Sequence, residues 1–255
     1  MQAMADLWSL LPVAPADTAL LVMILFAAGL VRGFSGFALS ALVMASAASF
    51  IAPILLIPIL WFQEMAASLL MACGGWRDAD RRRAALLVVG NWVGWPLGLW
   101  MTVSLPVAAS SRIALSVILV LAALQLLKIS IPALASRAGT LVAGFIAGIV
   151  SGVAHVGGMV VALYVLSQND TARSMRGTLV LYLFIGSLGS LVYLFSFGVM
   201  TLAAAQAALM LVPVTLIGVW LGTRLFNPRW EPYYKPFCLC LLIGLAALSL
   251  LRSLI

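Results

Sequence analysis

Two ionisable side chains lie inside apolar stretches, and each sits in a run of glycines. Arg32 lies within residues 29–36 (Gly-Leu-Val-Arg-Gly-Phe-Ser-Gly), and His155 lies within residues 148–158 (Gly-Ile-Val-Ser-Gly-Val-Ala-His-Val-Gly-Gly). A guanidinium donates hydrogen bonds in a fixed fork that suits planar, multi-oxygen anions. An imidazole titrates near neutrality, so it can donate to an anion or carry a coupling proton. The pattern favours an anion-binding site.

Plainer interpretations of these residues stay open. Arg32 can be an interfacial loop residue if the first apolar segment is a full span, and His155 can be a buried neutral histidine bonded to a carbonyl. Glu64, beside Gln63 in a third apolar segment, can pair with Arg32 or relay protons. Glu64 can also lie at the membrane interface, with Trp61 marking the headgroup level.

The candidate anion-binding residues come from both glycine-rich segments. Small residues let the backbone approach a ligand, and helix N-termini at a broken segment add N–H donors. The candidates for substrate binding are Arg32, Gly33, Ser35, Gly36, Ser151, Gly152, His155, Gly157 and Gly158, and the candidates for coupling or gating are Glu64, Gln63 and His155.

The composition places these residues in a membrane protein. Of 255 residues, 65% are hydrophobic and only 8% are charged, against about 25% charged in ordinary soluble domains. A chain this apolar excludes a water-soluble enzyme. The net charge of +7 comes from basic residues in short gaps between apolar stretches. That pattern is typical of membrane topology and not of nucleic-acid binding. The three cysteines show no metal-binding spacing, and no cofactor or metal is expected.

The apolar stretches predict six full spans, near residues 53–73, 84–104, 111–128, 177–197, 201–223 and 236–252. A spanning helix needs about 20 residues. Regions 18–50 and 140–167 are each divided by a glycine-rich break into arms of about 14–16 residues, which are short for a crossing. Each region is therefore expected to be a hairpin that enters the membrane and returns, or else two short tilted spans.

The chain also repeats itself. Residues 121–128 (Leu-Ala-Ala-Leu-Gln-Leu-Leu-Lys) recur as residues 245–252 (Leu-Ala-Ala-Leu-Ser-Leu-Leu-Arg), 124 positions later. Gly94 and Gly98 match Gly218 and Gly222 at the same offset, and glycines 29 and 33 match glycines 148 and 152 at an offset of 119. Glycines four apart let helices approach closely in lipid. We expect a first membrane repeat at 1–130 and a second at 131–255, together forming one transmembrane domain.

Charge parity predicts how the two repeats are oriented. Basic clusters follow the segments that would end in the cytoplasm, whereas the turns near 105–110 and 197–201 carry no charge. Both termini are then outside, and each half is a broken or re-entrant helical hairpin plus three transmembrane helices. The expected fold is an all-α polytopic membrane protein of two inverted repeats with 8–10 helical segments. Secondary transporters have this architecture, with the substrate at the repeat interface near the bilayer midplane.

Two other functions are compatible with parts of the sequence. Residues 33–36 (Gly-Phe-Ser-Gly) match the GxSG pattern of rhomboid intramembrane proteases, and Ser35 with His155 would form a Ser–His dyad. A duplicated topology does not match the six-helix rhomboid core, so no enzyme activity is expected. An anion channel is the other alternative.

The chain resembles the TauE/SafE (TSUP, sulfite exporter) family of permeases over nearly its whole length. The similarity lies in residues 143–152 followed by Gly157-Gly158, in residues 178–182 and 218–224, in the closing Leu-Ile-Gly-Leu-Ala-Ala-Leu run and, in the first half, in residues 33–36, 77–83 and 90–98. The resemblance implies export of small sulfur-containing anions such as sulfite, sulfoacetate or other organosulfonates across the bacterial cytoplasmic (inner) membrane. The expected partners are this substrate, membrane lipid and, if His155 carries one, a coupling proton.

Overall fold

The structure is a computed structural model that describes residues 14–36, 38–75, 79–129, 136–166, 168, 172–225 and 231–253. Within these ranges the secondary structure is helical, with no strand. The helices are α2 (Pro15–Ser35), α3 (Leu39–Ala47), α4 (Pro53–Gly75), α5 (Arg81–Ser104), α6 (Val107–Leu126), α7 (Arg137–Ala154), α8 (Gly157–Leu166), α9 (Ala172–Ser196), α10 (Leu202–Leu225) and α11 (Glu231–Arg252).

Helix length and composition identify a multi-pass membrane protein. Seven of the described helices (α2, α4, α5, α6, α7, α9 and α10) are long and apolar enough to cross a membrane, and α11 carries a shorter apolar stretch. The six spans expected from the sequence all appear as helices, with bounds shifted by a few residues. Large apolar side chains such as Met23, Val93 and Val192 are more than 60% exposed. Such exposure is expected on a surface that faces lipid and is unfavourable on a surface that faces water.

The first hairpin differs from the expected one in where it breaks. Helix α2 continues for 21 residues through Arg32 and Gly33, about 30 Å at the helical rise per residue. The chain turns only afterwards, at Gly36 and Ala38, whose φ angles are 80° and 81°. The expectation of two arms of similar length was wrong: a long arm is followed by a short arm of nine residues, α3.

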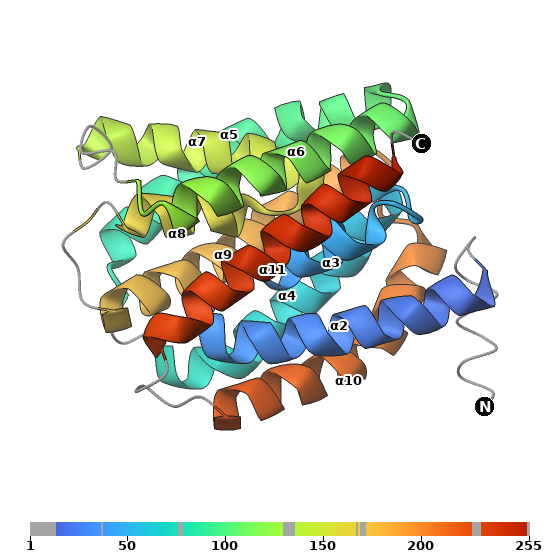
Figure 1. The fold of residues 1–255 in the computed structure, drawn as a ribbon. Helices are drawn as coiled ribbons and strands as arrows, with labels where there is room; N and C mark the ends of the chain where they lie inside the picture. The colour runs from blue at the N-terminus through green and yellow to red at the C-terminus, as the bar shows by residue number, and fades with distance from the viewer. Residues whose placement is uncertain are drawn as a thin grey trace.

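The second hairpin has the same asymmetry. Helix α7 runs for 18 residues and ends at His155, which takes a left-handed φ of 56°, and the short arm α8 follows with ten residues. Helices of nine and ten residues span only about 15 Å, which is too short to cross a bilayer. Figure 1 shows that α2 and α7 begin at opposite ends of the bundle. The inverted repeat itself stays a prediction.

Four of the glycines expected in the breaks, Gly29, Gly33, Gly148 and Gly152, serve instead as helix contacts. A Cβ on Gly29 would lie 2.6 Å from the Thr215 carbonyl oxygen, and one on Gly33 would lie 2.7 Å from the Thr223 amide nitrogen. Helix α2 therefore packs backbone to backbone on α10. Gly29 and Gly33 lie within the helix because their missing side chains allow this close approach. Helix α7 packs in the same way on α5 through a second set of glycines, namely Gly90, Gly94, Gly98, Gly144, Gly148 and Gly152.

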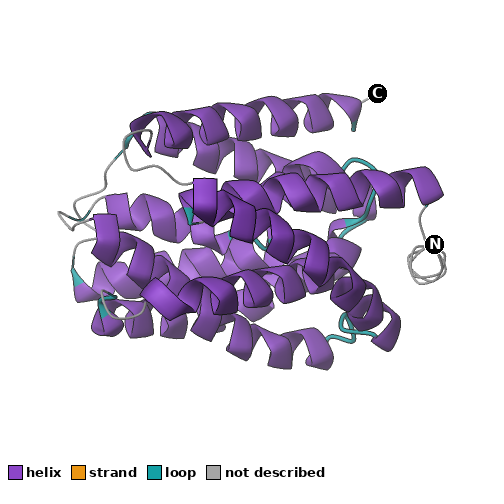
Figure 2. Cartoon of the chain, turned by 90° about the horizontal axis from the view of Figure 1, so that it is seen from below, coloured by secondary structure: helices purple, strands orange, loops and turns teal. Residues whose placement is uncertain are grey.

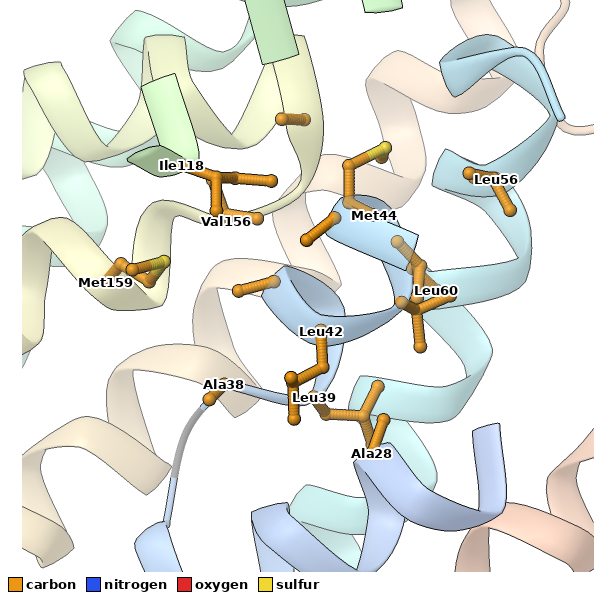
Figure 3. Close-up of a cluster of buried hydrophobic side chains, with 14 of the residues drawn as sticks. Ala28, Ala38, Leu39, Leu42, Met44, Leu56, Leu60, Ile118, Val156 and Met159 are labelled. Atoms are coloured by element: carbon orange, nitrogen blue, oxygen red, sulfur yellow. The ribbon is translucent and has the colours of Figure 1, made fainter. Parts of the chain in front are cut away.

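Helix α3 lies at the centre of the core (Figure 3). Every described residue of this helix except Ser46 is buried, and α2, α4, α6 and α11 pack around it. An apolar helix without a polar face needs such burial on all sides. The side chains that Figure 3 labels in this cluster are Ala28, Ala38, Leu39, Leu42, Met44, Leu56, Leu60, Ile118, Val156 and Met159.

The start of α2 and the end of α11 lie at one end of the bundle (Figures 1 and 2). The starts of α5, α7 and α11 lie at the opposite end (Figure 1), where α5 begins with Arg81, Arg82 and Arg83 and α7 begins with Arg137. The basic residues thus gather where the charge pattern requires, while the side of the membrane that this end faces stays a prediction.

Substitution of Gly29 by alanine is expected to destabilise the protein, because the added Cβ must push α2 away from the α10 backbone. We expect a loss of about 1–3 kcal/mol, as for other overpacked contacts. The matched control is Gly244→Ala in α11, where a Cβ would meet nothing within 4 Å. Thermal unfolding of the purified variants in detergent measures the difference. Equal stability of the two variants would contradict the glycine-contact account.

Candidate functional site

Two small, neighbouring cavities lie where the two hairpins turn. The larger, here called the Asn91 cavity, has a volume of about 30 Å³, and the smaller, the Arg32 cavity, about 10 Å³. Glu64, His155, Gly158 and Leu183 line both. The Asn91 cavity is also lined by Asn91, Trp95, Ser151, Gly157, Tyr182, Gly186, Ser187 and Ser190, and the Arg32 cavity by Arg32, Ala38, Ser40, Ala41, Val156 and Met159.

Arg32 is fully buried in the last turn of α2. Its Nη2 lies 3.2 Å from Glu64 Oε2 and donates to Ser68 Oγ, also at 3.2 Å, while Nη1 donates to the Gly36 carbonyl oxygen at 2.8 Å. The alternative of an interfacial loop residue is therefore wrong. The sequence suggested that the positive charge of Arg32 binds an anionic substrate. In the structure this charge is instead offset by the carboxylate of Glu64.

Glu64 holds the start of the short arm α3. Its Oε1 accepts hydrogen bonds from the Ser40 hydroxyl at 2.7 Å and from the Ser40 amide at 3.3 Å. The carboxylate is buried in the protein, and the expected pairing with Arg32 is confirmed. Trp61 is also buried and donates to the Ser187 carbonyl oxygen at 2.7 Å.

His155 caps α7 and lines both cavities. Its amide donates to the Ser151 carbonyl oxygen at 2.8 Å, and its ring meets Trp95 edge-on with centroids 6.5 Å apart. The ring Nδ1 is buried without a hydrogen-bond partner among the described residues. This atom therefore does not make the bond to a carbonyl oxygen that the plainer interpretation of His155 expected. Its part in substrate binding or coupling stays a prediction.

Helices α5 and α9 supply polar residues that were not among the sequence candidates. The Tyr182 hydroxyl donates to Asn91 Oδ1 at 2.9 Å, and both side chains are buried at the Asn91 cavity. Ser187 and Ser190 of α9 lie on the same wall. The sequence gives only a weak signal for them, because Asn91 is a single amide in the span expected near residues 84–104.

The first turn of α8 also borders the Asn91 cavity, through Gly157 and Gly158. The first turn of a helix leaves N–H groups without intrahelical partners, and the helix dipole places partial positive charge there. Ser151, at the end of α7, completes this side of the cavity. These three sequence candidates are therefore brought together.

Other sequence candidates lie elsewhere. Gly33 and Gly152 pack against the backbones of α10 and α5. Gly36 contributes the carbonyl that binds Arg32. Gln63 donates from Nε2 to the Ala208 carbonyl oxygen at 2.9 Å, and Ser35 is not among the residues that line either cavity, although His155 lines both.

The sequence model of the family described as Sulfite exporter TauE/SafE matches residues 21–249. The chain belongs to the TauE/SafE family. No curated protein and no solved structure gave a significant match. Membership in TauE/SafE identifies an exporter-type membrane transporter of sulfite or related anions. In this TauE/SafE chain the matched residues include the turns of both hairpins and every residue that lines the two cavities.

Substitution of Arg32 by alanine is expected to cost about 3–5 kcal/mol of stability, because it leaves the Glu64 carboxylate buried without its partner. The double variant Arg32→Met with Glu64→Gln should recover most of that loss, since it removes both charges and keeps an acceptor for Ser40. Thermal unfolding in detergent compares the two. A double variant no more stable than Arg32→Ala would show that the ion pair is not what Arg32 contributes.

Proposed function

We propose that this TauE/SafE chain is a secondary transporter that exports small sulfur-containing anions, sulfite or an organosulfonate, and binds them in the Asn91 cavity. The observation that carries the proposal is the convergence of neutral donors on one buried space. Asn91, Ser151 and the first turn of α8 come from three helices and border the same cavity, and Tyr182 of a fourth helix holds Asn91 by donating to its Oδ1.

The donor set suits an oxyanion with several oxygens. Amide, hydroxyl and backbone N–H groups each donate to one oxygen, and the partial positive charge at the α8 N-terminus favours a negative ligand there. Trp95 closes one side and stacks on Tyr193 with centroids 6.1 Å apart. In this proposal Arg32 and Glu64 hold the first hairpin in shape, and His155 lies between them and the substrate.

Export requires the helices to move. A cavity of about 30 Å³ holds about two water molecules, because about 10–15 Å³ on this measure holds one. An oxyanion of four or more heavy atoms needs more room, so the structure corresponds to a narrow state of the transport cycle. Because glycine contacts bind α2 to α10 and α5 to α7, we propose that each pair moves as a rigid unit during alternating access.

Filling the cavity is expected to stop transport without unfolding the protein. In Gly158→Val the branched side chain would project toward Leu183, since even a Cβ there lies 3.2 Å from Leu183 Cδ2. We expect sulfite or sulfonate uptake into proteoliposomes to fall at least about ten-fold, equivalent to about 1.4 kcal/mol. Gly244→Val, at an open position on α11, is the matched control.

The same proteoliposomes separate a carrier from a channel. A carrier shows saturable uptake and counterflow of labelled anion against an unlabelled gradient, whereas a channel shows neither. Normal transport by a folded Gly158→Val variant would place the substrate path elsewhere, and absence of transport of any sulfur anion by the unmodified protein would contradict the proposed function.

A further inference from the structure

The two short arms begin in different electrostatic surroundings. At α3 the second residue, Ser40, binds the Glu64 carboxylate of α4 through its amide and hydroxyl. At α8 the second residue, Gly158, faces Leu183 of α9 instead, with 3.2 Å between Leu183 Cδ2 and an ideal Cβ on Gly158. One helix start thus carries an internal carboxylate, and the other has an apolar neighbour.

The sequence repeat makes this difference systematic. The offset of 119 residues that relates Gly29 to Gly148 also relates Arg32 to Ser151 and Glu64 to Leu183. Where the first half holds an ion pair, the second half holds a hydroxyl and an apolar side chain, and both of these line the Asn91 cavity. At the start of α3 the protein supplies its own anion, Glu64. At the equivalent place beside the start of α8 it supplies the apolar Leu183 instead.

Unpartnered donors face this same space. Asn91 is 3% exposed and lines the cavity, and its Oδ1 accepts from Tyr182, while no described residue pairs with its Nδ2. His155 Nδ1 is likewise buried without a partner in the described residues. These atoms are an observation independent of the α8 N-terminus: Asn91 Nδ2 is a donor, and His155 Nδ1 is a donor in the Nδ1–H tautomer, so both suit a ligand with acceptor oxygens.

The cavity offers no unpaired charge to that ligand. Among the described residues that line the two cavities, the fixed charges are those of Arg32 and Glu64, which lie 3.2 Å apart and offset one another. The titratable groups are His155 and Tyr182. An imidazolium at His155 would carry the cost of placing a charge in a buried position, and the Tyr182 hydroxyl is used as a donor to Asn91.

We propose that the Asn91 cavity selects monoanions, namely bisulfite and organosulfonates of single charge, against dianions such as sulfate, fully deprotonated sulfite and sulfoacetate. The inference rests on the proposed function and narrows its substrate class. A helix N-terminus supplies about half a positive charge, enough to favour one negative charge. The desolvation cost grows with the square of the charge, so a dianion pays about four times the cost of a monoanion without a full cation to offset it.

The test compares methanesulfonate with sulfate, two tetrahedral anions that differ in charge. Their binding to the full-length protein in detergent is measured at pH 7.5 and constant ionic strength, by calorimetry and by ligand-induced thermal stabilisation. We expect methanesulfonate to bind at least about ten-fold more tightly. Equal binding, or tighter binding of sulfate, would overturn monoanion selection and leave the transport function standing. Binding of neither anion would count against the proposed function as well.

A charge variant tests the cause of the selectivity. Glu64→Gln frees the Arg32 charge while keeping an acceptor for Ser40, so the affinity ratio should shift toward sulfate by at least about ten-fold. Asp80→Asn is the matched control, because it removes one negative charge at the N-cap of α5 and asparagine caps helices equally well. An unchanged ratio in folded Glu64→Gln would contradict the charge argument. If that variant does not fold, the comparison in the unmodified protein decides alone.

Discussion

The buried pair of Arg32 and Glu64 lowers the energetic cost of the break between α2 and α3 in an apolar environment, because it binds backbone groups on both sides of the break. A helix that stops within a membrane leaves carbonyl and N–H groups without partners, and each costs several kcal/mol if it stays unsatisfied. Arg32 donates to the Gly36 carbonyl at the end of α2, and Glu64 accepts from the Ser40 amide at the start of α3. One ion pair thus serves both sides of the break and fixes the angle between the two arms.

At the second break, no described carboxylate accepts from the start of α8. The Thr102 hydroxyl contacts the Gly152 and Val153 carbonyl oxygens at 3.1 and 3.4 Å, so the end of α7 is supported from α5. The start of α8 instead borders the Asn91 cavity and has Leu183 where the first half has Glu64. A bound oxyanion would complete this second half in the way that Glu64 completes the first. The same asymmetry gives a physical reason why the ligand is an anion and why a single charge suffices.

Much of the fold followed from local patterns, and the site followed only in part. Apolar length predicted the spans, and the scarcity of charge made Arg32 and Glu64 stand out as a pair. The predicted position of the first break was wrong because glycines such as Gly29 and Gly33 occur both in turns and in close helix contacts. The contact with α10 places these two in a helix, and a local sequence pattern does not report that contact. Asn91 and Tyr182 were missed because their meeting depends on α5 and α9 packing side by side, which no local pattern reports.

The most direct measurement is an experimental structure of the protein with selenite, whose selenium is located by its anomalous scattering. The account predicts the anion in the Asn91 cavity, within hydrogen-bond distance of Asn91 Nδ2 and the first turn of α8, with Arg32 still paired to Glu64. An anion bound to Arg32 in place of Glu64, with the Asn91 cavity vacant, would contradict it.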